Sequence, residues 1–159
     1  MKPVMDPNTQ LSEHFTLGEM LRSDTAERLS IPNIPLKRHV TALENLCRRC
    51  LEPTRRHFGW PILVTSGYRC PLLNRRVAGA ENSQHTLGEA ADITVPHRHW
   101  PFCYTTQEQI ARVLFLWMRG NIDYDQLILE HRGQQTWWVH VSCRIDYRKN
   151  RHQALTLGQ

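Results

Sequence analysis

Three residues of this sequence have the side-chain types of a metal site: His85, Asp92 and His140. Asp92 lies in the apolar run AADITV, where a buried carboxylate must be hydrogen-bonded, paired with a charge or bound to a metal. Zinc prefers histidine nitrogen, cysteine sulfur and carboxylate oxygen, and a catalytic zinc site combines three protein ligands with an open position. Taken singly, the residues also fit a surface histidine, a turn carboxylate and a hydrogen-bonded strand histidine.

The segments that carry these residues are predicted to be a loop and two strands. His85 ends a loop, Asp92 lies in or beside the strand AADITV, and Gly88 lets the backbone between them turn tightly. His140 lies in WVHVS, where the two-residue period of a strand puts it on the face opposite its valine neighbours. If the two strands lie side by side, one ion can contact all three residues.

The elements around this pair predict an α+β domain with a small, mainly antiparallel sheet flanked by helices. A strand is expected over 62–65 and a loop over 71–83. The segments YDQLILE, HRGQQ and TWWVHVS predict a strand, a turn and a strand, that is, a hairpin.

Two amphipathic helices are expected to cover the sheet. The first begins near Leu36, is interrupted near Pro53 and ends before Gly59. The second opens on a capping box at Thr105 and ends at Gly120. In the first helix, the two cysteines of CRRC are expected to face the core, because no second pair completes a metal site.

The length indicates a single domain over 1–159. Residues 1–35 are expected to form an arm of short helical turns packed on the body, and residues 146–159 a polar tail that frays. The chain is expected to be a monomer.

The composition of the chain limits the classes of binding partner that are expected. The net charge of +5 suits a polyanion such as cell wall, but the basic residues are scattered, so no nucleic-acid partner is expected. No apolar run reaches the roughly 18 residues that span a bilayer. No secretory leader is recognised, which leaves the compartment open between the periplasm, the extracellular space and a phage-type lysin made in the cytosol.

The motifs resemble one known family. SQHTLGEAAD fits the pattern S-x-H-x-x-G-x-A-x-D of the zinc D-Ala-D-Ala carboxypeptidase family, and VTSGYR and WVHVS are similar to its other motifs. The resemblance covers about residues 11–142 and is greatest to the carboxypeptidase branch and its phage-borne relatives. It implies a fold of the Hedgehog/DD-peptidase type.

The resemblance also implies roles for single residues. His85, Asp92 and His140 correspond to the zinc ligands, and Arg69 to an arginine that helps to hold the substrate. The planar guanidinium of Arg69 suits a substrate carboxylate or a developing oxyanion, although a structural ion pair is the alternative. Ser83 either tightens the loop or touches the substrate.

The general base departs from the family pattern. Many members have an acid three residues before the last histidine, where this chain has Trp137. Glu130 is the favoured substitute, because a turn near Gly133 would pair it with residues 136–138 and bring it toward the last histidine. Asp125 is the second candidate.

The sequence therefore predicts a zinc-dependent peptidase that cleaves peptidoglycan stem peptides by metal-activated water. The bond cleaved stays open between that of a D-Ala-D-Ala carboxypeptidase and that of a related endopeptidase. The missing acid at Trp137 leaves an alternative, a zinc-containing cell-wall binding module without catalysis.

Overall fold

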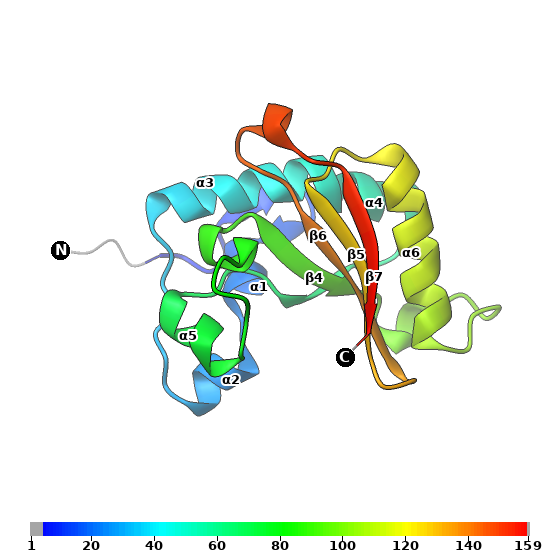
Figure 1. Ribbon diagram of the computed structural model, residues 1–159, viewed down its shortest axis with the longest axis horizontal. Helices are drawn as coiled ribbons and strands as arrows, with labels where there is room; N and C mark the ends of the chain where they lie inside the picture. The colour runs from blue at the N-terminus through cyan, green and yellow to red at the C-terminus, as the bar shows by residue number, and fades with distance from the viewer. Residues whose placement is uncertain (1–4, 159) are drawn as a thin grey trace.

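The computed structural model describes residues 5–158 as an α+β fold (Figure 1). The strands are β1 (Gln10–Ser12), β2 (Phe15–Thr16), β3 (Leu63–Ser66), β4 (Ala90–Thr94), β5 (Gln126–Arg132), β6 (Thr136–Ser142) and β7 (Gln153–Gly158). The α-helices are α1 (Leu17–Leu21), α2 (Asp24–Arg28), α3 (Lys37–Leu46), α4 (Glu52–Phe58), α5 (Pro71–Arg76) and α6 (Gln107–Asn121). Tighter or wider helical turns are η1 (Cys47–Leu51), η2 (Gln84–Leu87), η3 (His97–His99) and η4 (Tyr147–Lys149).

The larger sheet has the strand order β3-β4-β6-β5-β7. All its pairs are antiparallel except β5 with β7, so the expected small, mainly antiparallel sheet is confirmed. The predicted hairpin is β5 and β6. In the centre of the sheet, Asp92 of β4 is the direct partner of His140 of β6, and Glu130 of β5 is the direct partner of Trp138.

The two faces of this sheet have different tasks, because successive residues of a strand point to opposite sides. One face is part of the hydrophobic core, which it shares with α3 and α6; its strand residues include Ala91, Ile93, Leu127, Leu129, Val139 and Val141. The other face carries the polar residues Asp92, Glu130 and His140. The alternation thus places the chemistry on the face away from the long helices.

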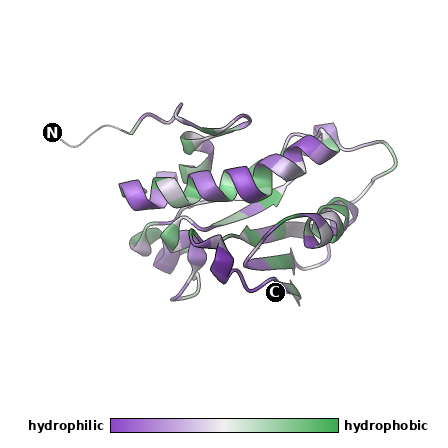
Figure 2. Cartoon of the chain, turned by 90° about the horizontal axis from the view of Figure 1, so that it is seen from above, coloured by the Kyte–Doolittle hydropathy of each residue, from purple (hydrophilic) through white to green (hydrophobic). Residues whose placement is uncertain are grey.

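One continuous helical rod, α3–η1–α4, packs on the core face. Several of its apolar residues, among them Leu43 and Leu46, are fully buried, and Figure 2 shows how hydrophobic and hydrophilic residues alternate along it. The predicted interruption takes the form of the π-helical turn η1, which immediately precedes α4 with its Pro53. The rod ends at Gly59, whose φ of 67° is left-handed, as expected of a glycine after a helix. The cysteines of CRRC are both buried in the core, as predicted.

The N-terminal elements lie beside this body. Strands β1 and β2 form a separate two-stranded sheet, and α1 contacts β3. Leu11, Phe15 and Met20 from this part of the chain are buried in the main core.

Three expectations about local structure are wrong. The expected loop over 71–83 begins with the helix α5, in which Pro71 occupies an early position and Cys70 is the N-cap. Proline is well placed at the first turn, where its missing N–H has no partner to lose. Residues 153–158 do not fray but form β7, whose backbone pairs in parallel with β5. The capping box of α6 lies one residue later than expected, at Thr106 and Gln109.

Candidate metal centre

Three side chains from separate segments meet on the polar face of the sheet. His85 comes from η2, Asp92 from β4 and His140 from β6, and one potential ligand atom of each lies within 4.8 Å of the others. Asp92 Oδ1 is 2.9 Å from His140 Nδ1 and 3.4 Å from His85 Nε2. The predicted cluster therefore forms, because cross-strand pairing fixes two members and η2 brings the third.

His85 is held in one orientation by the backbone. Its Nδ1 lies 2.7 Å from the carbonyl oxygen of Gly67, which can only accept a hydrogen bond, so Nδ1 carries the proton and donates. The lone pair is then on Nε2, the nitrogen that faces Asp92. Burial lowers the pKa of His85, which favours this neutral ring. A histidine fixed in this way by a carbonyl is the usual arrangement of a metal ligand.

Two motif glycines allow this arrangement. A Cβ on Gly67 would stand 2.3 Å from the carbonyl oxygen of Met20, so a side chain cannot fit there. Gly88, after η2, has a φ of 75°, and a Cβ on it would stand 2.5 Å from the carbonyl oxygen of His39. Both positions require glycine because backbone passes too close for any side chain.

Asp92 is fixed from its other side by Arg69. The guanidinium Nη2 donates to Asp92 Oδ2 over 3.1 Å, while Nε donates to Ser66 and Nη1 to Asn74. Burial alone would raise the pKa of Asp92, but the adjacent His85 and His140 hold that pKa well below its ordinary value. The carboxylate is therefore ionised, as a metal ligand must be.

The donor set fits a zinc ion: two imidazole nitrogens and one carboxylate oxygen, a combination that zinc accepts. All three side chains are largely buried, yet they reach the floor of an open groove. A second cluster, Glu13, His14 and Glu52, also has ligand atoms close together. In that cluster Arg56 forms an ion pair with Glu13, while Ser12 and His14 both contact Glu52. Protein groups therefore already occupy its carboxylates.

Glu130 lies beside the metal cluster without belonging to it. Its partner across the strand pair is Trp138, two residues from His140 on the same face. Burial raises the pKa of Glu130, and the negative charge of Asp92 raises it further. The indole Nε1 of Trp138 is buried and has no hydrogen bond of normal geometry among residues 5–158.

Position 137 could not supply the base in this register. Trp137 is 7 % exposed and belongs to the core cluster, on the opposite face from His140. The strand period therefore turns this side chain away from the metal cluster.

The other two predicted residues have structural contacts. Asp125, the second candidate for the base, is fully buried and bound by Arg144 and Arg151. The hydroxyl of Ser83 accepts a hydrogen bond from the backbone N–H of His85 over 3.3 Å and so caps η2. Ser83 also lines the groove.

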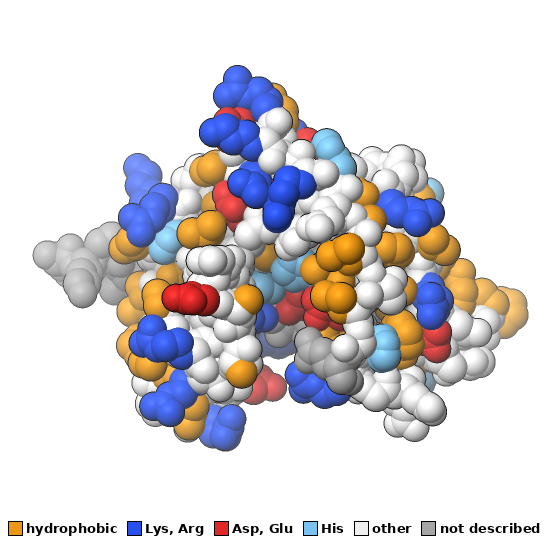
Figure 3. Space-filling view, viewed as in Figure 1, with side chains coloured by type: hydrophobic (Ala, Val, Ile, Leu, Met, Phe, Trp, Pro, Cys, Tyr) orange, Lys and Arg blue, Asp and Glu red, His pale blue; other side chains and the backbone are white. Residues whose placement is uncertain are grey.

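The groove over the cluster has a volume of about 750 Å³. Figure 3 shows the hollow, with histidine and acidic side chains at its floor and basic side chains above it. Strand parity places Trp138 on the same face as His140, and it lines the groove. Sequence reasoning missed the groove arginines Arg132, Arg144 and Arg151, because their positions depend on the tertiary fold.

A family model described as Peptidase M15 matches residues 13–115, well over half of the chain. The chain belongs to the peptidase M15 family. This confirms the resemblance drawn from the SxHxxGxAxD motif, and it implies a metallopeptidase with zinc and a peptide substrate. The matched segment contains His85 and Asp92 but ends before Glu130 and His140, which the sheet register adds.

No curated protein matches the chain. Within residues 5–158, no helix has both the length and the apolar character needed to cross a membrane.

Proposed function

We propose that this protein is a zinc-dependent peptidase that cleaves the stem peptides of peptidoglycan. The observation that supports this most is the convergence of His85, Asp92 and His140 at the floor of a groove, with Glu130 beside them. The peptidase M15 membership supports the reaction class, and the basic net charge suits an anionic wall.

Zinc, when bound to these ligands, supplies a lowered pKa for water and polarisation of the scissile carbonyl. Proton transfer and substrate positioning are the tasks of the chain's own residues. Glu130, at a carboxylate oxygen, accepts the proton of the attacking water and passes it to the leaving amine. Its raised pKa brings it closer to the operating pH of a general base.

Arg69 has two tasks in this proposal. Its bond to Asp92 Oδ2 orients that ligand, and its position on the groove wall places a positive charge near the substrate. A guanidinium there can stabilise the negative charge that develops on the carbonyl oxygen. Ser83 positions His85 through the η2 cap.

We further propose that cleavage is endopeptidic. The groove of 750 Å³ continues past the cluster into a second hollow of about 550 Å³, and the two share Arg69, Asp92 and Trp138. The second hollow extends toward Ser23 and Thr25. A peptide can therefore extend on both sides of the cluster, whereas a carboxypeptidase needs a closed end for the terminal residue.

The test is digestion of purified peptidoglycan with mass spectrometry of the products and metal analysis of the protein. We expect about one zinc per chain, cleavage inside the stem peptide, and loss of both metal and activity in Asp92→Ala. Hydrolysis that continues at the same rate in protein freed of metal would contradict the proposal.

The second candidate is a zinc-containing wall-binding module without catalysis, which the tryptophan at position 137 favours. It predicts that zinc-loaded protein binds peptidoglycan but releases no fragment from it. The digestion experiment separates the two candidates.

A further inference from the structure

A pair of arginines lines one end of the groove, away from the hollow at Ser23 and Thr25. Arg144 follows β6 by two residues, and Arg151 lies shortly before β7. Both contact the carboxylate of Asp125, which is fully buried beneath them. The peptidase mechanism above uses none of these three residues.

Asp125 fixes the direction of both side chains. It accepts hydrogen bonds from Arg151 Nη2 over 2.7 Å, from Arg151 Nε over 3.0 Å and from Arg144 Nε over 2.8 Å. The backbone N–H of Arg151 also donates to it over 2.9 Å. The guanidinium groups are thus positioned before any ligand arrives, which reduces the entropy lost on binding.

The pair carries more positive charge than Asp125 alone neutralises. Two guanidinium groups share one carboxylate, so one positive charge is left over. Among residues 5–158, Nε is the only guanidinium nitrogen of Arg144 that donates to a protein acceptor. Its two Nη groups remain for a ligand, and 37 % of the side chain is exposed.

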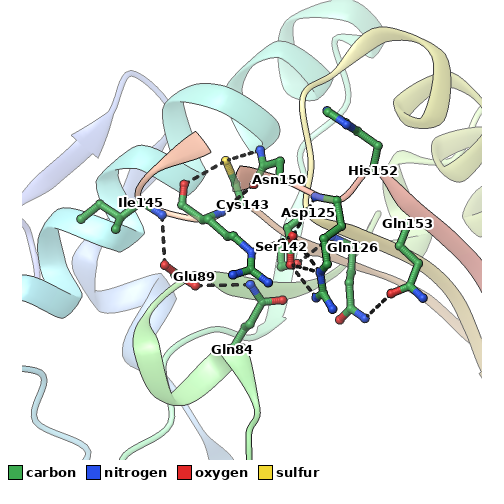
Figure 4. Close-up of polar contacts among 12 residues, drawn as sticks. Gln84, Glu89, Asp125, Gln126, Ser142, Cys143, Ile145, Asn150, His152 and Gln153 are labelled. Atoms are coloured by element: carbon green, nitrogen blue, oxygen red, sulfur yellow. Dashed lines mark hydrogen bonds and ion pairs between the residues drawn. The ribbon is translucent and has the colours of Figure 1, made fainter. Parts of the chain in front are cut away.

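The same groove also contains a negative charge, the carboxylate of Glu89. Its Oε1 accepts from the backbone N–H of Ile145 over 3.0 Å and its Oε2 from Gln84 Nε2 over 3.3 Å. Figure 4 shows both bonds, with Glu89 between Ile145 and Gln84. Glu89 therefore keeps its negative charge, but among residues 5–158 its carboxylate is held by these neutral donors and forms no ion pair with Arg144 or Arg151.

We propose that Arg144 and Arg151 form a carboxylate-binding subsite of the peptide groove. The proposal rests on the peptidase function and adds to it: the substrate carries an acidic group a short distance from the bond that is cleaved. A guanidinium binds a carboxylate through two parallel N–H bonds, and Arg144 presents its free Nη groups for this. The carboxylate comes either from an acidic side chain or from the C-terminus of the peptide.

The experiment compares three synthetic stem peptides with the zinc-loaded protein. One has all its carboxylates free, one has a carboxamide in place of the side-chain carboxylate, and one has a carboxamide at the C-terminus. We expect kcat/KM to fall by about 10- to 100-fold for one of the two amides, as the loss of charge-assisted hydrogen bonds predicts. The amide that is affected identifies the source of the carboxylate.

Two variants test the assignment. Arg144→Gln should reduce the difference between free acid and amide to less than threefold, chiefly through KM. Arg148→Gln is the matched control, because it removes the same charge four residues away, from a side chain that is 79 % exposed and does not line the groove. Arg148→Gln should keep the full preference.

A preference that survives unchanged in folded Arg144→Gln would overturn the subsite. If that variant does not fold, Gln126→Glu is the substitute: it puts a carboxylate on the groove wall beside the pair without touching Asp125. Gln126→Glu should weaken the preference at least fivefold, and an unaltered preference would again overturn the subsite.

Calorimetric binding of the same peptides to Glu130→Gln separates the subsite from the peptidase function. If wild-type protein cleaves no peptide but Glu130→Gln binds the free acid more tightly than the amide, the peptidase function fails and the subsite holds. If cleavage occurs with equal rates and equal affinities for all three peptides, the subsite fails and the peptidase function holds.

Discussion

The role of Glu130 can be tested by replacing it with glutamine. The substitution keeps the shape of the side chain, so the packing opposite Trp138 is preserved, but it removes the group that accepts a proton. Glu130 is not a member of the His85, Asp92 and His140 cluster, so the zinc content should stay the same.

The expected loss of activity follows from the role of Glu130 as general base. General base catalysis contributes about 10²- to 10⁴-fold, which corresponds to about 2.7–5.5 kcal/mol of transition-state stabilisation. The loss should fall on kcat, because the substrate contacts proposed for Arg69 and Arg144 are unchanged. Removing a general base should affect KM by less than about threefold.

The assay measures fragment release from purified peptidoglycan by chromatography and mass spectrometry, with zinc determined on the same samples. Glu89→Gln is the matched control, since it removes a carboxylate of the same groove whose hydrogen bonds within residues 5–158 come from Ile145 and Gln84 alone. Its kcat should remain within a few-fold of wild type. Activity of Glu130→Gln within tenfold of wild type, or loss of its zinc, would refute the assignment.

Three further outcomes follow from the structure. His140→Ala should lose zinc and all peptidase activity, which metal analysis and peptidoglycan digestion measure. Gly88→Ala should destabilise the fold by about 2–3 kcal/mol in chemical unfolding, because its φ is 75° and a Cβ would press on the backbone of His39. Asp125→Asn should cost about 3 kcal/mol, the lower end of the range for a broken buried pair, because both arginines keep contact with water. Burial would raise the pKa of Asp125, but the bonds from Arg151 and Arg144 lower it, so wild-type stability should fall as the pH drops below about 4 and should fall less steeply in Asp125→Asn.

Most of the metal cluster could be predicted from the sequence because two simple periodicities determine it. Strand alternation puts Asp92 and His140 on one face of their strands, and the family motif ties His85 to Asp92 through a short turn. The position of Glu130 followed from the same logic, since a hairpin with its turn near Gly133 pairs it with Trp138.

What the sequence did not reveal depends on contacts between distant residues. The helix α5 is only six residues long, too short for a hydrophobic period to stand out, and its signal was Pro71 after the capping Cys70. The polar strand β7 has no strong alternation of its own, and its order comes from the backbone of β5. The arginine subsite was hidden because Arg144 and Arg151 are joined through Asp125, which immediately precedes β5, the strand that lies between β6 and β7.

The end of β6 connects the metal cluster with the arginine pair. Ser142 lies two residues after His140 and accepts two hydrogen bonds. The backbone N–H of Asp125 donates to its carbonyl oxygen over 2.7 Å, and the backbone N–H of Gln126 donates to its hydroxyl oxygen over 2.9 Å. The next residue, Cys143, donates its N–H to the carbonyl of Glu89 over 2.9 Å. The same strand thus sets the distance between a metal ligand and the carboxylate that orients both arginines. Because these backbone bonds are buried, that distance is rigid, and the substrate must match it with a fixed spacing between its scissile bond and its acidic group.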